Sequence, residues 1–272
     1  MAKDLNKIYT REDILSELRR MNAPTDSIVL MHSSLRLIGK VEGGVDALLD
    51  TLIEYFTSGG GLFCIPTHTW KNLKNDITLD MNDPSTSLGA LSDIAAADKR
   101  GLRSENPTHS MVVYGDREKA ADFIKNEPFI SSGTAADSCY GKLYSLGGYV
   151  LLVGVAHNRN TYLHAVEELI GTPNRLSAEP REVKVKRITG EIVSRTTRTH
   201  FTDFTGDVSL RFPKYETAFR YHGAIIDGYI GNAPTQLCDA RIMKDVMELI
   251  QKNSDGKDPL ADERDIPPRL YR

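Results

Sequence analysis

The sequence is poor in cysteine and contains no long hydrophobic run. Three cysteines in 272 residues, Cys64, Cys139 and Cys238, are too few and too scattered for a disulfide framework or a C-x-x-C metal site. The longest apolar run, residues 149–156, is far shorter than the ~20 residues that span a bilayer. The first residues hold no apolar segment of the kind found in secretory signals. We therefore expect a soluble, cytoplasmic protein.

Neither sign of charge dominates the chain. The 34 Lys and Arg residues and the 37 Asp and Glu residues give a formal net charge of −3, which argues against a dedicated nucleic-acid-binding protein. Hydrophobic residues make up 40% of the chain and charged residues 26%, close to the average for globular proteins. The length of 272 residues allows one large domain or two small ones, at roughly 100–200 residues per domain.

Several common catalytic and nucleotide-binding motifs are absent. Neither G-x-x-x-x-G-K-[ST] nor G-x-G-x-x-G occurs, so we expect no nucleoside triphosphate or dinucleotide site of the usual kind. The lack of a G-x-S-x-G turn disfavours an α/β-hydrolase. There are seven histidines but no H-E-x-x-H motif, and His164 with Glu168 is only a weak two-ligand match. We expect no metal, and a metal-dependent hydrolase remains a minor alternative.

Apolar segments typical of strands alternate with helical patterns. Residues 44–56 give the clearest helical pattern, with apolar side chains at steps of three and four: Val45, Leu48, Leu49, Leu52, Ile53 and Phe56. Strands are expected at residues 27–31, 62–65, 110–115 and 150–155, and further helices at residues 88–98, 116–125 and from 161 onward. Because the strands are apolar throughout, the pattern predicts an α/β fold with a central, mostly buried β-sheet flanked by helices on both faces.

Residues 181–202 follow a different pattern. Polar and apolar residues alternate from Glu182 to Lys186, and Thr189-Gly190-Glu191 is typical of a hairpin turn. This predicts a smaller antiparallel β-ribbon, inserted in the α/β domain and half exposed. The ribbon is rich in cations: Arg181, Lys184, Lys186, Arg187, Arg195 and Arg198.

The C-terminal part of the chain completes the predicted domain. A strand is expected at residues 224–231. Apolar side chains then predict a final helix that carries Leu237, Ile242, Val246, Leu249 and Ile250. We expect one domain over residues 1–254 and a loosely held tail over residues 255–272, which are rich in Asp, Pro and Arg.

Small polar residues gather where three of the predicted strands meet loops, at residues 31–36, 66–70 and 106–110. In open α/β sheets, ligands bind beyond the carboxyl ends of the strands. Hydroxyl residues at such positions bring N–H and O–H donors to a phosphate or to an amide-bearing chain. Caps and turns are the commoner use of any one cluster, but three clusters at one sheet edge indicate a binding site.

A fourth cluster follows the apolar strand at residues 150–155. If Thr161 caps a helix, His164 lies in its first turn, and Glu167 and Glu168 follow at i+3 and i+4 on the same face. A neighbouring carboxylate fixes the tautomer of an imidazole and makes it more basic, as a general base requires. A histidine packed beneath a helix with two solvated glutamates is an equally good interpretation of this spacing.

Taken together, these segments resemble the aminoglycoside 3-N-acetyltransferase family, also called the antibiotic N-acetyltransferase family. They occur in the order found in the family and cover most of the chain from about residue 15 to 250. The matching segments are MHSSLRLIGKVEGGVDALLDTL (31–52), GGGLFCIPTHT (59–69), STSLGALSD (85–93), GLRSENPTHSMVVYG (101–115), SCYGKLYSLGGYVLLVGVAHNRNTYLHAVEEL (138–169) and GYIGNAPTQLCDAR (228–241).

The resemblance implies transfer of an acetyl group from acetyl-coenzyme A to an amine, namely the 3-amino group of a 2-deoxystreptamine aminoglycoside. It also implies that His164 is the catalytic residue. The segments that resemble the coenzyme A contacts of the family supply His32, Ser33, Ser34, Leu35, Thr67, Thr108, His109 and Ser110.

The chemistry of this transfer agrees with the residues present. A cationic amine must lose a proton before it attacks a thioester, and His164 can accept it when oriented by Glu168 or by a carboxylate such as Asp203. Attack creates an oxyanion, for which groups near Thr67 or Thr108 are candidate donors. Direct transfer needs no cysteine nucleophile. The two substrates are the expected partners of a monomer or a homodimer, without nucleic acid or membrane.

The acceptor amine is the least constrained part of this hypothesis. A polycationic aminoglycoside favours a cleft lined with carboxylates, and Asp80 and Asp203 lie in segments suited to that role. The basic ribbon would repel such an acceptor if it lined the cleft. The alternatives are another amine as acceptor, the metal-dependent hydrolase, a non-catalytic coenzyme A-binding protein, and an acyl-enzyme route through Cys139 in a predicted loop.

Overall fold

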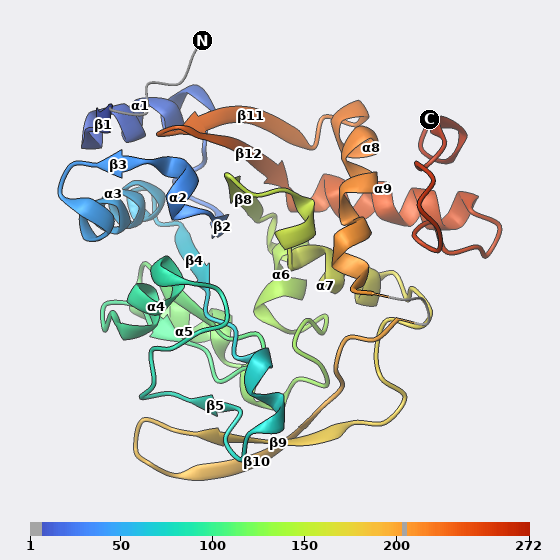
Figure 1. The fold of residues 1–272 in the computed structure, drawn as a ribbon, viewed down its shortest axis with the longest axis horizontal. Coiled ribbons are helices and arrows are strands. Elements are labelled where there is room, and N and C mark those ends of the chain that lie inside the picture. Colours follow the sequence, from blue (N-terminus) through green and yellow to red (C-terminus); the bar gives the residue numbers. More distant parts are fainter. Residues whose placement is uncertain (1–6, 203–205) are drawn as a thin grey trace.

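The structure, a computed structural model, describes residues 7–202 and 206–272. Its centre is a seven-stranded sheet with strand order β11-β12-β8-β2-β4-β7-β6 (Figure 1). β2 pairs in parallel with both β8 and β4, whereas the outer pairs of the sheet are antiparallel. The strands are β2 (Ile28–Ser33), β4 (Leu62–Pro66), β6 (Leu102–Arg103), β7 (Met111–Tyr114), β8 (Tyr149–Val153), β11 (Ile225–Ile230) and β12 (Ala233–Asp239).

Helices cover both faces of this sheet. α1 (Arg11–Arg20), α3 (Gly44–Thr57) and α4 (Ala90–Ala97) pack on one face, with the short α2 (Leu35–Ile38) beside them. The other face carries α5 (Arg117–Ile124), α6 (Cys139–Leu146), α7 (Tyr162–Leu169), α8 (Glu216–Tyr221) and α9 (Ala240–Asn253). The predicted α/β class, with a buried sheet between helices, is confirmed. Among the described residues, no helix combines the length and the apolar character needed to cross a bilayer.

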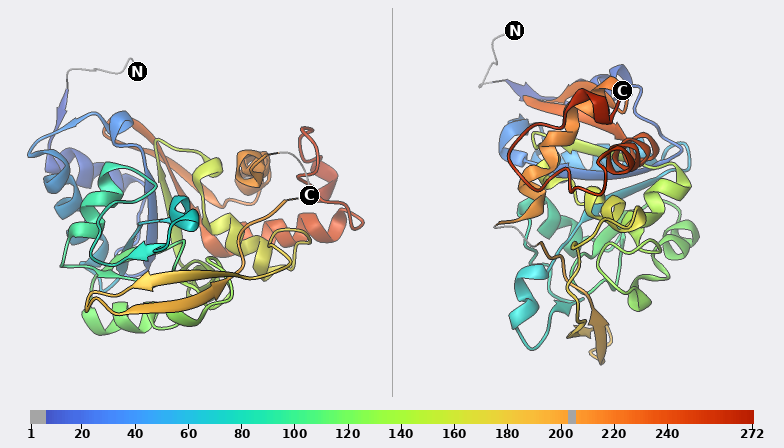
Figure 2. Two further views of the ribbon diagram at one scale, coloured as in Figure 1. Left: turned by 60° about the horizontal axis from the view of Figure 1, so that its bottom comes forward. Right: turned by 90° about the vertical axis from the view of Figure 1, so that its right-hand side faces the viewer.

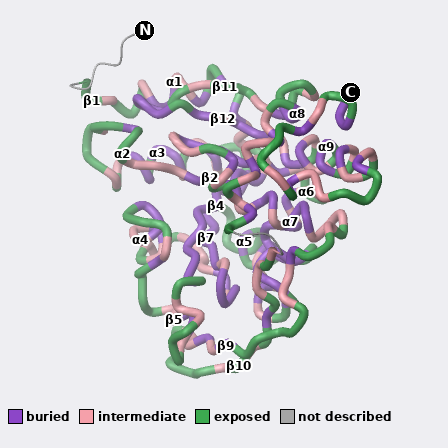
Figure 3. Tube along the Cα trace, turned by 45° about the vertical axis from the view of Figure 1, so that its right-hand side comes forward, coloured by how far each residue is buried: buried purple, intermediate pink, exposed green. Residues whose placement is uncertain are grey.

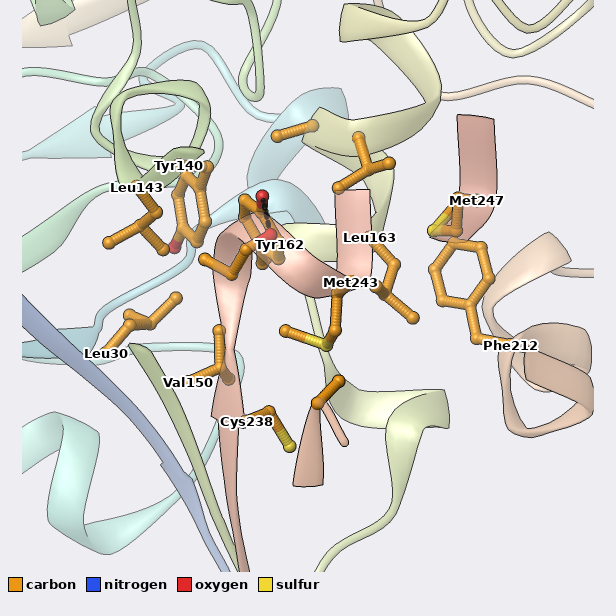
Figure 4. Packing of buried hydrophobic residues seen from close by; sticks show 14 of the residues in the cluster. Leu30, Tyr140, Leu143, Val150, Tyr162, Leu163, Phe212, Cys238, Met243 and Met247 are labelled. Carbon is orange, nitrogen blue, oxygen red and sulfur yellow. Dashed lines mark hydrogen bonds between the residues drawn. The ribbon is translucent and has the colours of Figure 1, made fainter. Parts of the chain in front are cut away.

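Alternate residues of the central strands enter two separate hydrophobic clusters. In β2, Leu30 contributes to the cluster under α5–α9, while Val29 and Met31 contribute to the cluster under α1, α3 and α4. Figure 4 shows part of the first cluster, in which Leu30 and Val150 from paired strands lie near one another. This alternation follows from the pleat of a strand, which points successive side chains to opposite faces. It explains why β8 and the first four residues of β2 carry apolar side chains on both faces.

The predicted helix at residues 44–56 is α3, and it leads into β4 through a tight turn. Phe56 at its end stacks on Phe63 of β4, with ring centroids 5.1 Å apart. Gly61 lies between them, and a β-carbon on this residue would meet the backbone oxygen of Ser27 at 2.5 Å. Only glycine therefore allows this close approach of the turn to the chain that enters β2.

Two elements near the C-terminal half differ from the sequence-based prediction. Leu237, expected on the final helix, lies on β12, which pairs with both β11 and β8. The helix begins only after Asp239, whose side chain caps it by accepting from the N–H of Ile242 at 3.0 Å. Cys139, expected in a possibly exposed loop, is fully buried at the start of α6, where Ser138 is the N-cap. Periodicity alone did not separate a short apolar strand from the helix that follows it.

The predicted ribbon forms a second, smaller sheet at one edge of the molecule (Figures 1 and 2). β9 (Arg181–Lys186) and β10 (Ile192–Thr197) pair antiparallel, and β5 (Leu79–Asp80) adds to β9 in parallel. The ribbon is thus anchored to the segment between β4 and α4. Two further short strands, β1 (Ile8–Tyr9) and β3 (Lys40–Val41), pair in parallel with each other elsewhere in the fold.

Most cations of the ribbon are paired with carboxylates from neighbouring segments. Lys184 Nζ lies 2.6 Å from Asp76, and Lys186 Nζ lies 2.9 Å from Asp80. Arg187 and Arg195 approach Glu105 at 3.1 and 3.8 Å, and Arg187 also contacts Glu191. These carboxylates therefore neutralise most of the positive charge of the ribbon.

The C-terminal segment differs from the loose tail that its composition suggested. Its apolar residues are buried in the same hydrophobic cluster as those of α9: Leu260, Ile266, Leu270 and Tyr271. Figure 3 shows the burial along the chain. Asp258 also forms an ion pair with the buried Arg175 at 2.8 Å. These few apolar side chains attach the segment to the domain because each of them is buried.

The packing of this segment can be tested with one substitution. Leu260 is 0% exposed, so Leu260→Ala removes buried methyl groups and leaves a cavity. We expect a loss of about 2–5 kcal/mol in the free energy of unfolding, measured by urea denaturation. Leu210→Ala is the matched control, because Leu210 is 65% exposed and its truncation should change stability by less than about 0.5 kcal/mol. Equal unfolding midpoints for the two variants would contradict this packing.

Candidate active site

A cavity of about 1010 Å³ lies beyond the carboxyl ends of the central strands. Residues that follow β2, β4 and β8 line it, together with the N-terminal part of α7 and residues 198–202 and 206–209. This is the edge at which parallel strands of an α/β sheet expose their ligand-binding loops. Of the site residues predicted from sequence, the lining includes His32, Ser33, Ser34, Leu35, Thr108, His109 and His164.

Two of the predicted coenzyme A contacts lie elsewhere. Thr67 and Ser110 are buried and bonded to each other, with their hydroxyl oxygens 2.9 Å apart. The N–H of Thr67 donates to the carbonyl of Ser110 at 2.7 Å, and the Ser110 hydroxyl donates to the carbonyl of Thr67 at 2.7 Å. These groups extend the pairing of β4 with β7 and are not part of the cavity lining. Neither residue offers a free donor at the cavity.

Of the two predicted acceptor-binding carboxylates, the one that the structure describes is not part of the cavity lining. Asp80 pairs with Lys186 on the ribbon, and Asp203 lies outside the described residues. Asp207 lines the cavity instead, and its side chain accepts from the N–H of Ser209 at 2.9 Å. Arg36, Arg159 and Arg198 line the same cavity, so guanidinium groups outnumber carboxylates along its described wall.

Four histidines from distant segments form a row of contacting rings along the cavity. The ring of His164 stacks on that of His200, with centroids 4.0 Å apart and an interplanar angle of 23°. His200 is followed by His109 at 4.9 Å, and His109 by His68 at 4.6 Å. At the end of the row, Nε2 of His68 lies 2.6 Å from the hydroxyl of Tyr140. His164 and His109 were predicted from the sequence, but His200, which follows β10 with no motif around it, was not.

Gly133 makes this row possible. A β-carbon at position 133 would lie 2.2 Å from Nδ1 of His109 and 2.8 Å from the hydroxyl of Thr108. These two groups are themselves in contact at 2.8 Å. Any side chain at position 133 would therefore displace the His109 ring from its neighbours.

The surrounding protein keeps these imidazoles neutral. Desolvation lowers the pKa of His164 to about 4, although Asp207 opposes the effect. It also lowers the pKa of His68, His109 and His200 well below the usual value, with like-charge repulsion between the rings as a further cause. At neutral pH each ring is therefore uncharged and has one unprotonated nitrogen. Such a ring can accept a proton.

Within residues 7–202 and 206–272, Glu167 rather than Glu168 is the carboxylate that approaches His164. Its Oε2 lies 3.7 Å from Nδ1 of His164 and has no hydrogen-bond partner among the described residues. Its Oε1 accepts from Nε of Arg175 at 2.5 Å, and Arg175 in turn pairs with Asp258. Burial raises the pKa of Glu167 to about 7, against the opposing effect of Arg175. An imidazolium at His164 would be stabilised by this carboxylate.

Glu168 turns away from His164 toward two hydroxyl groups. Ser132 and Thr134 each donate to one of its carboxylate oxygens, at 2.6 and 2.5 Å. Thr134 also lies 2.8 Å from Nε2 of His200. On a helix, residues 167 and 168 lie about one turn after His164, to either side of it. In the structure only the carboxylate of Glu167 points toward the imidazole ring. The expectation that Glu168 orients His164 is not met by this geometry.

Neither a thiol nor a metal-binding cluster is found in the described parts of the chain at this cavity. Cys64, Cys139 and Cys238 are free but fully buried, they are not part of the lining, and burial raises the pKa of each thiol. Within residues 7–202 and 206–272, no group of three or more His, Cys, Asp or Glu side chains is placed to hold a metal ion. The imidazoles of the row contact one another through their rings.

Comparison with known proteins gives a consistent result. Residues 30–251 match the family described as aminoglycoside 3-N-acetyltransferase. The SPbeta prophage-derived aminoglycoside N(3')-acetyltransferase-like protein YokD of Bacillus subtilis (strain 168) is 26% identical over 178 residues, which are 58% of this chain and 64% of that protein. Aminoglycoside N(3)-acetyltransferase III of Salmonella sp is 26% identical over 184 residues, 62% of this chain and 63% of that protein. The matched regions thus span just under two thirds of these relatives.

Solved structures share the fold over nearly the whole chain. The crystal structure of YokD from Bacillus subtilis has a TM-score of 0.78 at 22% identity, covering 93% of this chain and 97% of that one. A mutant of aminoglycoside acetyltransferase AAC(3)-IVa in complex with a gentamicin has a TM-score of 0.74 at 23% identity, covering 93% of both chains. AAC-IIIb in a binary complex with CoASH has a TM-score of 0.73 at 23% identity, covering 88% of this chain and 94% of that one.

The neutral histidines should make the fold sensitive to acid. A depressed pKa means that the unfolded chain binds protons below pH ~6.5 that the folded chain does not bind, so stability rises with pH and falls as pH decreases below that value. Each such histidine costs about 1.4 kcal/mol at pH 5.5. His157, whose pKa burial lowers to about 4, provides a test away from the imidazole row.

We expect His157→Gln to reduce the difference in urea unfolding free energy between pH 7.5 and 5.5 by about 1.4 kcal/mol. Asn158→Gln, one residue along the chain, is the control and should leave that difference unchanged because it removes no titrating group. A wild-type protein equally stable at both pH values would contradict the assignment of neutral histidines.

Proposed function

Because the chain belongs to the aminoglycoside 3-N-acetyltransferase family, we propose that it transfers the acetyl group of acetyl-coenzyme A to the 3-amino group of a 2-deoxystreptamine aminoglycoside. The observation that carries this proposal is a neutral imidazole, His164, on the wall of a large cavity at the carboxyl edge of the sheet. Relatives of the same fold are described in complex with CoASH and with a gentamicin. The three free cysteines suit a reducing, cytoplasmic location.

The cavity offers suitable groups for coenzyme A. Ser33 and Ser34 bring hydroxyls to the end of β2, and Arg36 and Arg159 bring guanidinium groups that pair well with phosphate. His32 adds a buried Nε2 without a hydrogen-bond partner among the described residues. We therefore assign the binding of the pantetheine chain and phosphates to these residues, together with Thr108 and His109 of the same lining.

His164 acts as the general base in this proposal. A neutral ring accepts the proton that nitrogen loses as it bonds to the acetyl carbon, and the resulting imidazolium faces Oε2 of Glu167. Because that oxygen has no other partner among the described residues, it can stabilise the new charge. The hydroxyls that line the cavity are candidate donors to the oxyanion.

Direct transfer without an acyl-enzyme fits the positions of the cysteines. Each thiol is fully buried, and burial raises its pKa away from the thiolate form that attacks thioesters. Both substrates must then occupy the cavity together, and holding them in place supplies much of the rate enhancement.

The charge of the cavity favours a second candidate acceptor. Arg36, Arg159 and Arg198 line it, with Asp207 as the carboxylate on the described wall, whereas a polycationic aminoglycoside is best bound by several carboxylates. An amine with fewer positive charges is therefore the alternative acceptor for the same chemistry.

Replacement of His164 tests the proposed base. We expect His164→Ala to lower the rate of acetyl transfer by about 10²–10⁴-fold while coenzyme A binds as in the wild type. Thiol release from acetyl-coenzyme A and calorimetric binding of coenzyme A measure the two properties. His222→Ala is the control, since His222 is a histidine outside the cavity lining and contacts the backbone of Tyr271. Undiminished turnover by His164→Ala would exclude it as the base.

A panel of acceptors separates the two candidates. Thiol release is measured with aminoglycosides and with amines of one or two positive charges, and the product is identified by mass spectrometry and NMR. An aminoglycoside acetylated at the 3-amino group is the expected result. Turnover restricted to the less charged amines would assign the second candidate, and no thiol release with any amine would contradict acetyl transfer.

A further inference from the structure

The carboxylate of Glu168 is held by two fully buried hydroxyl groups. Ser132 Oγ donates to Oε2 at 2.6 Å, and Thr134 Oγ1 donates to Oε1 at 2.5 Å. An ionised carboxylate has only acceptors, so one hydroxyl on each oxygen is the arrangement it favours. These two donors hold the carboxylate of Glu168 in place behind Thr134 and favour its ionised form, against the effect of burial, which raises its pKa.

The single hydroxyl hydrogen of Thr134 decides the tautomer of His200. Oγ1 of Thr134 lies 2.8 Å from Nε2 of His200. Because the hydroxyl hydrogen is already directed at Glu168, Nε2 must be the donor in this contact and therefore carries the proton. The other nitrogen of the neutral ring, Nδ1, then has a free lone pair. Glu168, Thr134 and His200 form a relay that ends on an unprotonated nitrogen of the His200 ring.

His200 lies at the reaction cavity together with His164. Both rings line it, and they stack with their centroids 4.0 Å apart. Among the described residues, His200 also contacts His109, with centroids 4.9 Å apart, and Thr134, through which it is connected to Glu168. Arg198 and Asp207 line the same cavity. His200 is therefore a second neutral imidazole at the cavity, beside His164.

Acetyl transfer to a cationic amine requires two proton removals from one nitrogen. The ammonium loses one proton before the nitrogen can attack, and the nitrogen of the tetrahedral adduct loses another after the nitrogen–carbon bond has formed. When the carbon–sulfur bond breaks, one proton ends on the sulfur of coenzyme A and the other is released to solvent. The proposed reaction can therefore use two bases, one for each proton.

Resting on the proposed acetyl transfer, we propose that His200, positioned by Glu168 through Thr134, takes the first proton from the acceptor ammonium, and that His164 takes the second. The ring of His200 gains a positive charge that Glu168 stabilises through the Thr134 hydroxyl. Two imidazolium rings 4.0 Å apart repel each other, so the first proton leaves to solvent before His164 is protonated. Thr134 and Glu168 are positioning residues in this scheme.

The pH dependence of Thr134 variants tests this division of roles. Thr134→Val has nearly the same shape but removes the hydroxyl, and Thr134→Ser is the matched control that keeps it. We expect Thr134→Val and His200→Gln to lower kcat/KM at pH 7 by about 10- to 100-fold. The loss should shrink as the pH rises past the pKa of the acceptor amine, since solvent then removes the first proton. Thr134→Ser should stay near the wild-type rate, and His164→Gln should remain impaired at every pH.

A loss in Thr134→Val that is equal at pH 7 and above the amine pKa would overturn the proposal, because it would indicate only a structural effect. So would wild-type turnover by Thr134→Val or His200→Gln at pH 7. Coenzyme A binding and the thermal unfolding midpoint verify that each variant is folded.

A second measurement does not depend on turnover. Imidazole ¹⁵N NMR of the resting protein should show His200 protonated at Nε2 in the wild type and in Thr134→Ser, and lose this fixed form in Thr134→Val. Protonation at Nδ1, or a spectrum unchanged in Thr134→Val, would overturn the relay. If the wild type releases no thiol with any amine, the proposed function fails, and this spectrum still decides whether the relay exists.

Discussion

The close packing of four neutral imidazoles is the interaction on which the site depends. His68, His109, His164 and His200 come from four separate segments, and adjacent ring centroids lie 4.0 to 4.9 Å apart. At such distances neighbouring charges repel strongly, so the rings pack together only while they are neutral. The rest of the fold must therefore hold four segments in fixed relative positions: the loops after β4 and β10, the segment before β7, and helix α7.

The mixed sheet fixes the relative positions of these segments. β2 pairs in parallel with β8 and β4, so the loops after these strands meet at one edge. β7 returns antiparallel to β4, and for that reason the segment before it, with His109, reaches the same edge. The ribbon returns the chain from α7 to His200, and Gly133 leaves the room that the row requires. Changes far from the cavity can thus act on it through any of four segments.

Much of the fold could be predicted from the sequence because its elements carry local signals. The helix at residues 44–56 and the apolar strands were recognisable from periodicity, and the family resemblance is confirmed by the match over residues 30–251. Leu237 was assigned to the wrong element, since β12 ends at Asp239 and α9 begins at the next residue, with no loop between them. The attachment of the C-terminal segment through Leu260 had no local signal at all.

The site was only partly predictable for the same reason. His164 stood out through its spacing to two glutamates, but spacing could not tell which carboxylate faces the ring. That choice depends on Ser132 and Thr134, more than thirty residues away, which hold Glu168. His200 has no motif around it and becomes visible only when the ribbon brings it onto His164. The net charge of −3 likewise hid a separation of charges: the ribbon is paired with carboxylates, while arginines line the cavity.

The central claim is that acetyl transfer takes place at the stacked imidazoles of this cavity. A crystal structure of the protein with coenzyme A tests it most directly. We expect the thiol sulfur to lie in the cavity within reach of His164 and His200, with the phosphates near Arg36 or Arg159. Coenzyme A bound at another surface, or in the cavity with its sulfur far from both rings, would contradict the account.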